Sequence, residues 1–93
     1  MNEISPKLKR RIKKLLSGEK PTVRIGKAKI SGNLLSEIER QLKDKEMVKV
    51  KMLKSSLQGL NAKSVASEIA EKTDSNLIEV RGHTFILYKR RKN

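Results

Sequence analysis

The residues with the clearest potential for chemistry lie in one short segment, VRIGKAKISGNLL at positions 23–35. An alternating apolar run ends at Gly26, Lys27 and Lys29 follow it, and a helical pattern of apolar residues begins after Ser31. Glycine lets another backbone approach closely, and the first turn of a helix presents free N–H groups with partial positive charge. The two lysines add full charges. The segment therefore predicts a binding site for an anion such as a phosphate group.

A second cluster of candidate residues lies on a helix predicted over residues 6–17. Six of the eight residues from 7 to 14 are lysine or arginine, and none is acidic. Four of them have the i, i+3, i+4, i+7 spacing of neighbours on one helix face: Lys7, Arg10, Arg11 and Lys14. This row of cations predicts contact with phosphates. The alternative is a helix face that is only solvated.

Catalytic and metal-binding patterns are absent from the sequence. His83 is the only histidine, and it falls in a predicted hairpin turn, where a solvated side chain is the expectation. Glu68 and Glu71 share a predicted helix face, but Lys63 and Lys72 lie nearby. No group of residues has the spacing of metal ligands, and there is no cysteine. We therefore expect a protein without catalysis, cofactor, metal or small-molecule substrate.

The net charge of +13 is unevenly distributed along the chain. Residues 1–20 carry +5, residues 21–33 carry +3 and residues 81–93 carry +5, whereas residues 34–80 hold eight basic and eight acidic side chains. If the basic segments meet in space, they form one positive face opposite a neutral one. Such a face is typical of proteins that bind a polyanion.

Length and composition set the class of protein. A chain of 93 residues suits one small domain, 1–93, with residues 90–93 as a loose basic tail. The absence of cysteine fits a reducing compartment, and no apolar run approaches the length of a membrane span. The first residues lack the apolar core of a signal peptide. We expect a cytoplasmic, monomeric protein with no membrane partner.

Hydrophobic periodicity and turn residues predict the elements that position these side chains. The expected helices cover residues 6–17, 32–44 and 62–73, and the expected strands cover residues 22–25, 47–53, 77–81 and 84–89.

The order of these elements, α-β-α-β-α-β-β, predicts the architecture. Strand–helix–strand segments imply parallel strands with right-handed crossovers. The last two strands form a hairpin, for which Gly82 provides the first central residue of a type II′ turn. Phe85 to Tyr88 have no polar interruption, so the last strand is expected in the centre of the sheet. We predict a two-layer α/β fold, with a four-stranded mixed sheet and all helices packed on one face.

Three blocks of sequence resemble a known family. They are KPTVRIGKAKISGNLLSEIERQL, MVKVKM and IAEKTDSNLIEVRGHTFILYKR, and the last contains the pattern G-x-T-x-x-L-Y-[KR]. In this order and spacing they resemble the CRM domain, the RNA splicing and ribosome maturation module, and its stand-alone YhbY-like form. The resemblance covers Leu8 to Arg90. It implies a fold like the C-terminal domain of initiation factor three, RNA binding, and association with precursors of the large ribosomal subunit.

The family carries a GxxG loop between its first strand and the following helix, similar to the loop with which KH domains clamp a nucleic-acid backbone. Here the loop reads Gly26, Lys27, Ala28, Lys29, so a lysine replaces the second glycine. The resemblance implies a role for Gly26 in RNA binding, and Lys27 and Lys29 would supply charge.

Charge and resemblance together predict a set of RNA-binding residues: Lys7, Arg10, Arg11, Lys14, Arg24, Gly26, Lys27, Ala28, Lys29, Lys89, Arg90 and Arg91. Lys49 and Lys51 are predicted on a strand face away from the helices, where they either contact RNA or only keep that face wet. With two aromatic residues, Phe85 in the core and Tyr88 with a buried ring, recognition should rely on phosphate, sugar and shape rather than base stacking.

The predicted function is non-catalytic binding of structured RNA, with large-subunit ribosomal RNA or its precursor as the partner and ribosome assembly or maturation as the process. Two alternatives stay open. One is a general nucleic-acid coat protein similar to the archaeal Alba proteins, or a permanent ribosomal protein. Alba proteins share the strand–GK–helix pattern but lack the basic leading helix and the G-x-T-x-x-L-Y ending. The other is an assembly factor whose neutral face, formed by the second and third helices, binds a protein.

Overall fold

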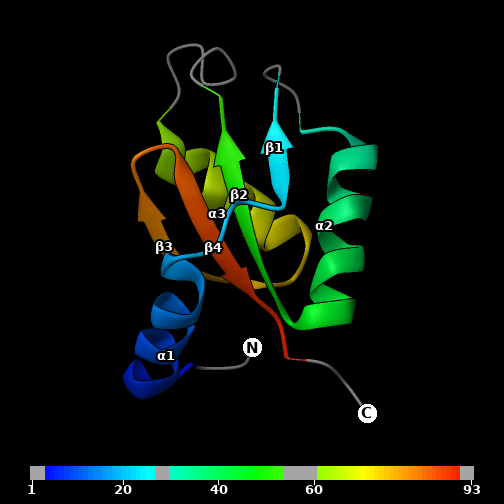
Figure 1. Cartoon of the computed structure of the whole chain (residues 1–93). Coiled ribbons are helices and arrows are strands. Elements are labelled where there is room, and N and C mark those ends of the chain that lie inside the picture. Colours follow the sequence, from blue (N-terminus) through cyan, green and yellow to red (C-terminus); the bar gives the residue numbers. More distant parts are fainter. Residues whose placement is uncertain (1–3, 27–29, 54–60, 91–93) are drawn as a thin grey trace.

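The computed structural model describes residues 4–26, 30–53 and 61–90. In these ranges three helices and four strands follow one another in the predicted order, with bounds that agree with the prediction to within one residue (Figure 1). The elements are α1 (Pro6–Ser17), β1 (Val23–Ile25), α2 (Gly32–Lys45), β2 (Met47–Met52), α3 (Ala62–Lys72), β3 (Asn76–Arg81) and β4 (Thr84–Tyr88).

The four strands form one mixed sheet in the order β1-β2-β4-β3. β1 is parallel to β2, whereas β4 is antiparallel to both β2 and β3. The predicted central position of the last strand is therefore confirmed. The hairpin turn is confirmed as well: Gly82 has a φ of +59° and is the one residue of the turn with positive φ, as a type II′ turn requires.

Each helix begins at a capping side chain. The Ser5 hydroxyl accepts a hydrogen bond from the Leu8 N–H at the start of α1. The Ser31 hydroxyl and the Asn61 side-chain oxygen accept equivalent bonds from Leu34 and Ser64 at the starts of α2 and α3. Because each cap satisfies an N–H group that has no partner inside the helix, it fixes where the helix begins. None of the described helices is long and apolar enough to cross a membrane.

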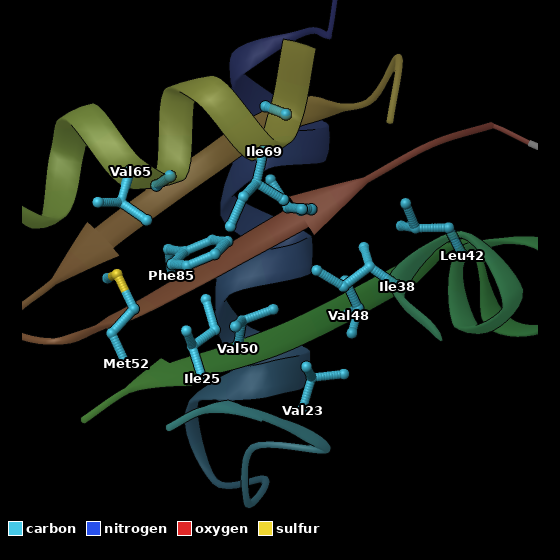
Figure 2. Packing of buried hydrophobic residues seen from close by; sticks show 13 residues of the cluster. Val23, Ile25, Ile38, Leu42, Val48, Val50, Met52, Val65, Ile69 and Phe85 are labelled. Atoms are coloured by element: carbon cyan, nitrogen blue, oxygen red, sulfur yellow. The ribbon is translucent and has the colours of Figure 1, made fainter. Parts of the chain in front are cut away.

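The main hydrophobic core lies between the sheet and the pair α2 and α3 (Figure 2). Phe85 of β4 packs with Val65 and Ile69 of α3, and Val48 of β2 lies beside Ile38 of α2. All five side chains are buried. The prediction of Phe85 as a core residue is confirmed.

One part of the predicted architecture is wrong: the helices do not all pack on the same face. Ile12 of α1 packs with Ile78 and Ile86 in a second buried cluster on the opposite face of the sheet. Figure 1 shows α3 behind the sheet and α1 on the near side. The cause is the continuous apolar sequence of β4, since Phe85 and Leu87 face one side while Ile86 faces the other. A strand that is apolar on both faces needs cover on both.

Candidate nucleic-acid interface

The predicted row of cations on α1 is present and exposed. Lys7, Arg10, Arg11 and Lys14 all line one shallow groove along the helix. The opposite side of the helix docks on the sheet through Ile12, which is 1% exposed. Lys13 points elsewhere and pairs with Glu79 of β3 at 3.9 Å. The structure therefore brings together the four α1 residues that the spacing selected.

A lysine of the sheet holds the end of α1. The Lys49 ammonium donates hydrogen bonds to the carbonyl oxygens of Leu16, at 2.9 Å, and Glu19, at 2.8 Å. The last carbonyls of a helix lack partners within the helix, and a cation also interacts favourably with the negative end of the helix dipole. The expectation that Lys49 lies on a face away from the helices is therefore wrong, because α1 covers that face.

At the end of β1 the structure describes Arg24 and Gly26. Arg24 is exposed between Val23 and Ile25, whose side chains are buried in the main core. Gly26 does not have positive φ, and a Cβ added to it would meet no atom within 4 Å. Neither backbone conformation nor packing within the described chain requires glycine here, and the space beside its Cα is open. The loop residues Lys27, Ala28 and Lys29 lie outside the described residues.

Lys89, the first of the C-terminal cations, does not lie beside Gly26. Lys89 follows Tyr88, which pairs with Met47 at the start of β2, whereas Gly26 follows Ile25, which pairs with Met52 at its end. The two residues therefore lie at opposite ends of β2, and Figure 1 shows the end of β4 at the opposite end of the sheet from the tip of β1. Gly26 and Lys89 therefore do not belong to one continuous positive face.

The C-terminal cations also have different surroundings from the α1 row. The half-buried Lys89 donates from its ammonium to the Thr73 carbonyl oxygen at 3.0 Å, beside the end of α3. Arg90 lines a groove with Arg40 and Lys43 of α2. Lys89 thus has a structural role at the end of α3, and Arg91 lies outside the described residues.

Two further cations, which the sequence prediction did not include in the site, share a register with Arg24. Lys51 of β2 is the direct partner of Arg24, and Arg81 is linked to Lys51 through Thr84 of β4. All three cations are exposed. The sequence signal for Lys51 was its alternation with buried residues, but the alignment with Arg24 and Arg81 depends on strand order, which local sequence does not contain.

The opposite side of the molecule carries compensated charge. On α2 the Arg40 guanidinium donates to the Glu37 carboxylate at 2.6 Å, and on α3 Lys72 pairs with Glu68 at 3.6 Å. The hydrogen bond from Arg40, followed by one from Gln41, holds the pKa of Glu37 below its ordinary value. These pairs leave less net positive field on α2 and α3 than on α1.

The aromatic side chains do not form a stacking surface. Phe85 is buried in the main core, and Tyr88 is half-buried against the α1 cluster. Among the described residues there is also no group of three or more His, Cys, Asp or Glu side chains that could hold a metal. The surface on the α1 side is therefore built from cations on a rigid helix and sheet, an arrangement that suits an extended polyanion.

Comparison with known proteins agrees with a surface that suits a polyanion. Residues 4–89 match the CRS1 / YhbY (CRM) domain, so the chain belongs to this family, and the resemblance noted in the sequence is confirmed. A solution structure of a hypothetical protein from Staphylococcus aureus, described as a candidate RNA-binding protein, has the same fold. It superposes with a TM-score of 0.78 at 28% identity and covers 98% of this chain and 93% of the other.

Two curated relatives are named as probable RNA-binding proteins. One, from Methanocaldococcus jannaschii, is 29% identical over 89 residues, which is 96% of this chain and 66% of the relative. The other, from Bacillus subtilis, is 29% identical over 72 residues, which is 77% of this chain and 73% of the relative. The chain thus spans slightly less than two thirds of the length of the first of these proteins.

Proposed function

We propose that this protein binds structured RNA without catalysing a reaction. The observation that carries the proposal is the row of four exposed cations on α1, which line one groove on the outer side of a helix fixed to the sheet. The family and the names of the relatives support RNA as the polyanion. The target we propose is the ribosomal RNA of the large subunit, or the precursor of that RNA. Binding would take place in the cytoplasm, during ribosome assembly or maturation.

The proposed mode of recognition is contact with phosphates, sugars and overall shape. Arginine and lysine side chains on α1 neutralise phosphate charge, and this releases counterions from the RNA. Contacts to the backbone set position and orientation but carry no direct sequence information. Because Phe85 and Tyr88 are not exposed on this surface, base stacking on aromatic rings is not part of the proposal.

The loop after β1 is the second element of the proposed site. Gly26 leaves open space beside the end of β1, and α2 begins a few residues later at its Ser31 cap. In this loop the positive charges of Lys27 and Lys29 would pair with phosphate groups. Lys29 stands at the position of the second glycine of a GxxG motif. In this role the domain would act as a monomer and without a cofactor.

In-cell crosslinking followed by sequencing of the attached RNA tests the proposal. We expect a sharp peak on large-subunit ribosomal RNA or its precursor, and the position of the peak would identify the step. Reads scattered over all transcripts, or recovery of DNA to the same extent, would contradict it and favour a general coat protein. Stoichiometric recovery with mature ribosomes would instead favour a permanent ribosomal protein.

A further inference from the structure

A row of cations crosses the half of the sheet that α1 leaves open. Arg24 of β1 pairs with Lys51 of β2, Lys51 pairs with Thr84 of β4, and Thr84 pairs with Arg81 of β3. The row therefore runs perpendicular to the strands and uses all four of them. Neighbouring strands are about 4.8 Å apart, so the backbone positions of the row span about 14 Å.

These side chains project on the α1 side of the sheet. Arg24 and Lys51 each lie between two residues that are buried in the core on the other side. Thr84 lies two residues before Ile86, which packs in the α1 cluster. Since side chains alternate along a strand and paired residues share a face, the whole row is on one face.

None of the three cations is paired with an acid in the described part of the chain, which has ion pairs at Lys13, Arg40 and Lys72 instead. By contrast, Lys49 lies two residues before Lys51 on the same face and uses its ammonium to hold the end of α1. The row is therefore available to a ligand, whereas its neighbour is occupied.

The row is continuous with the cations of α1. Lys13 and Lys14 line a groove together with Arg81 and Thr84, so this groove joins the end of the α1 row to the start of the sheet row. The acid of the groove, Glu79, is paired with Lys13 and so adds little net negative charge. At the other end of the row, Arg24 lies two residues before Gly26.

We infer that the open half of the sheet is a second RNA-binding surface, on which Arg24, Lys51 and Arg81 hold consecutive parts of a phosphodiester backbone that crosses the strands. The inference rests on the proposed function and extends it. The backbone would pass from α1 through the groove and over the sheet to Arg24, near the end of β1. In this position other RNA-binding sheets carry aromatic rings for stacking on bases, whereas here the side chains are cations, so the sheet holds the backbone and does not read bases.

A triple variant, Arg24→Gln with Lys51→Gln and Arg81→Gln, tests this inference. The matched control is Arg40→Gln with Lys43→Gln and Lys63→Gln, which removes the same charge from exposed positions on α2 and α3. Both are compared with the unchanged protein on a labelled hairpin RNA with a single-stranded extension, over a series of salt concentrations. Circular dichroism and thermal unfolding check that both variants fold.

We expect the sheet variant to bind about tenfold more weakly or worse at moderate salt, with a log–log salt slope that is smaller by about 2 to 3. The loss should be equal on two RNAs of unrelated sequence, because phosphate contacts carry no sequence information. The control should stay within about threefold of the unchanged protein, because net charge alone acts only through the screened long-range field.

Other results would overturn the inference. If the sheet variant and the control lose equal affinity, or neither loses any, the row makes no RNA contact. A variant with Lys7, Arg10, Arg11 and Lys14 changed to glutamine separates this failure from that of the proposed function. Weaker binding by the α1 variant with an unaffected sheet variant removes the sheet surface but leaves the proposed function. If the unchanged protein does not bind RNA, both the proposed function and the inference about the sheet are wrong.

Discussion

The Lys49 ammonium lies 2.9 Å from the Leu16 carbonyl oxygen and 2.8 Å from that of Glu19, and so joins the middle of the sheet to the end of α1. This contact separates two lysines that the sequence presents as equivalent. Lys49 and Lys51 both alternate with buried residues of β2. Only Lys49 lies under α1, and Lys51 remains exposed.

Replacing Lys49 by methionine should therefore destabilise the protein by about 1–3 kcal/mol, because the substitution removes hydrogen bonds from a charged donor to helix-end carbonyls. Lys51→Met, the matched control two residues away, should change the free energy of unfolding by less than about 0.5 kcal/mol. Urea denaturation of both variants measures the difference. Equal stabilities would show that the contact does not hold α1.

The docking of α1 depends on Ile12. Ile12→Ala removes a buried side chain from the small cluster with Ile78 and Ile86, and should cost about 2–4 kcal/mol. Hydrogen exchange of α1 amides should accelerate more than that of β4 amides, because β4 also belongs to the larger core. Leu15→Ala is the control on the same helix, since Leu15 is 55% exposed and should contribute little. Uniform acceleration throughout the sheet would contradict independent docking of α1.

The carboxylate of Glu37 gives a pH dependence with a defined sign. Hydrogen bonds from Arg40 and Gln41 lower its pKa in the folded state. A group with a depressed folded pKa adds stability above its unfolded pKa, and loses that contribution as the pH falls through the folded pKa. Glu37→Gln should therefore be slightly less stable than the unchanged protein near neutral pH, and the two should converge in acid. A stability difference that grows on acidification would contradict this assignment.

The loop lysines give a prediction that depends on charge alone. Lys27→Glu with Lys29→Glu should weaken RNA binding by about tenfold or more while leaving the fold intact. The reason is that two side chains that attract phosphate are replaced by two that repel it. The control, Lys43→Glu with Lys63→Glu, changes the net charge equally at exposed positions on α2 and α3. Fluorescence anisotropy with the same hairpin RNA compares them. Unchanged affinity in the loop variant would remove the loop from the site.

Much of the fold was predictable because its signals are local. Ser31 and Asn61 mark helix starts through hydrogen bonds to nearby N–H groups, and Gly82 marks a turn that needs positive φ. The α1 row was predictable for the same reason, since helical spacing alone places its four cations together. The order of the elements and the final hairpin predicted the mixed sheet.

Other parts depend on long-range packing. The side of the sheet that α1 covers follows from Ile78 and Ile86, which become neighbours of Ile12 only after the sheet forms. The alignment of Arg24, Lys51 and Arg81 needs the strand order, in which β4 lies between β2 and β3. For this reason the sequence did not show that Lys49 and Lys89 have structural roles, whereas Lys51 and the α1 row are exposed.

The most direct test of RNA binding by phosphate neutralisation is the salt dependence of affinity for structured RNA. If about seven phosphates are contacted, four by the α1 row and three by the sheet row, the plot of log affinity against log salt should have a slope near −6. Changing the four α1 cations to glutamine should reduce the magnitude of that slope by about 3. A slope near zero for the unchanged protein, or the same slope for the α1 variant, would contradict the central claim.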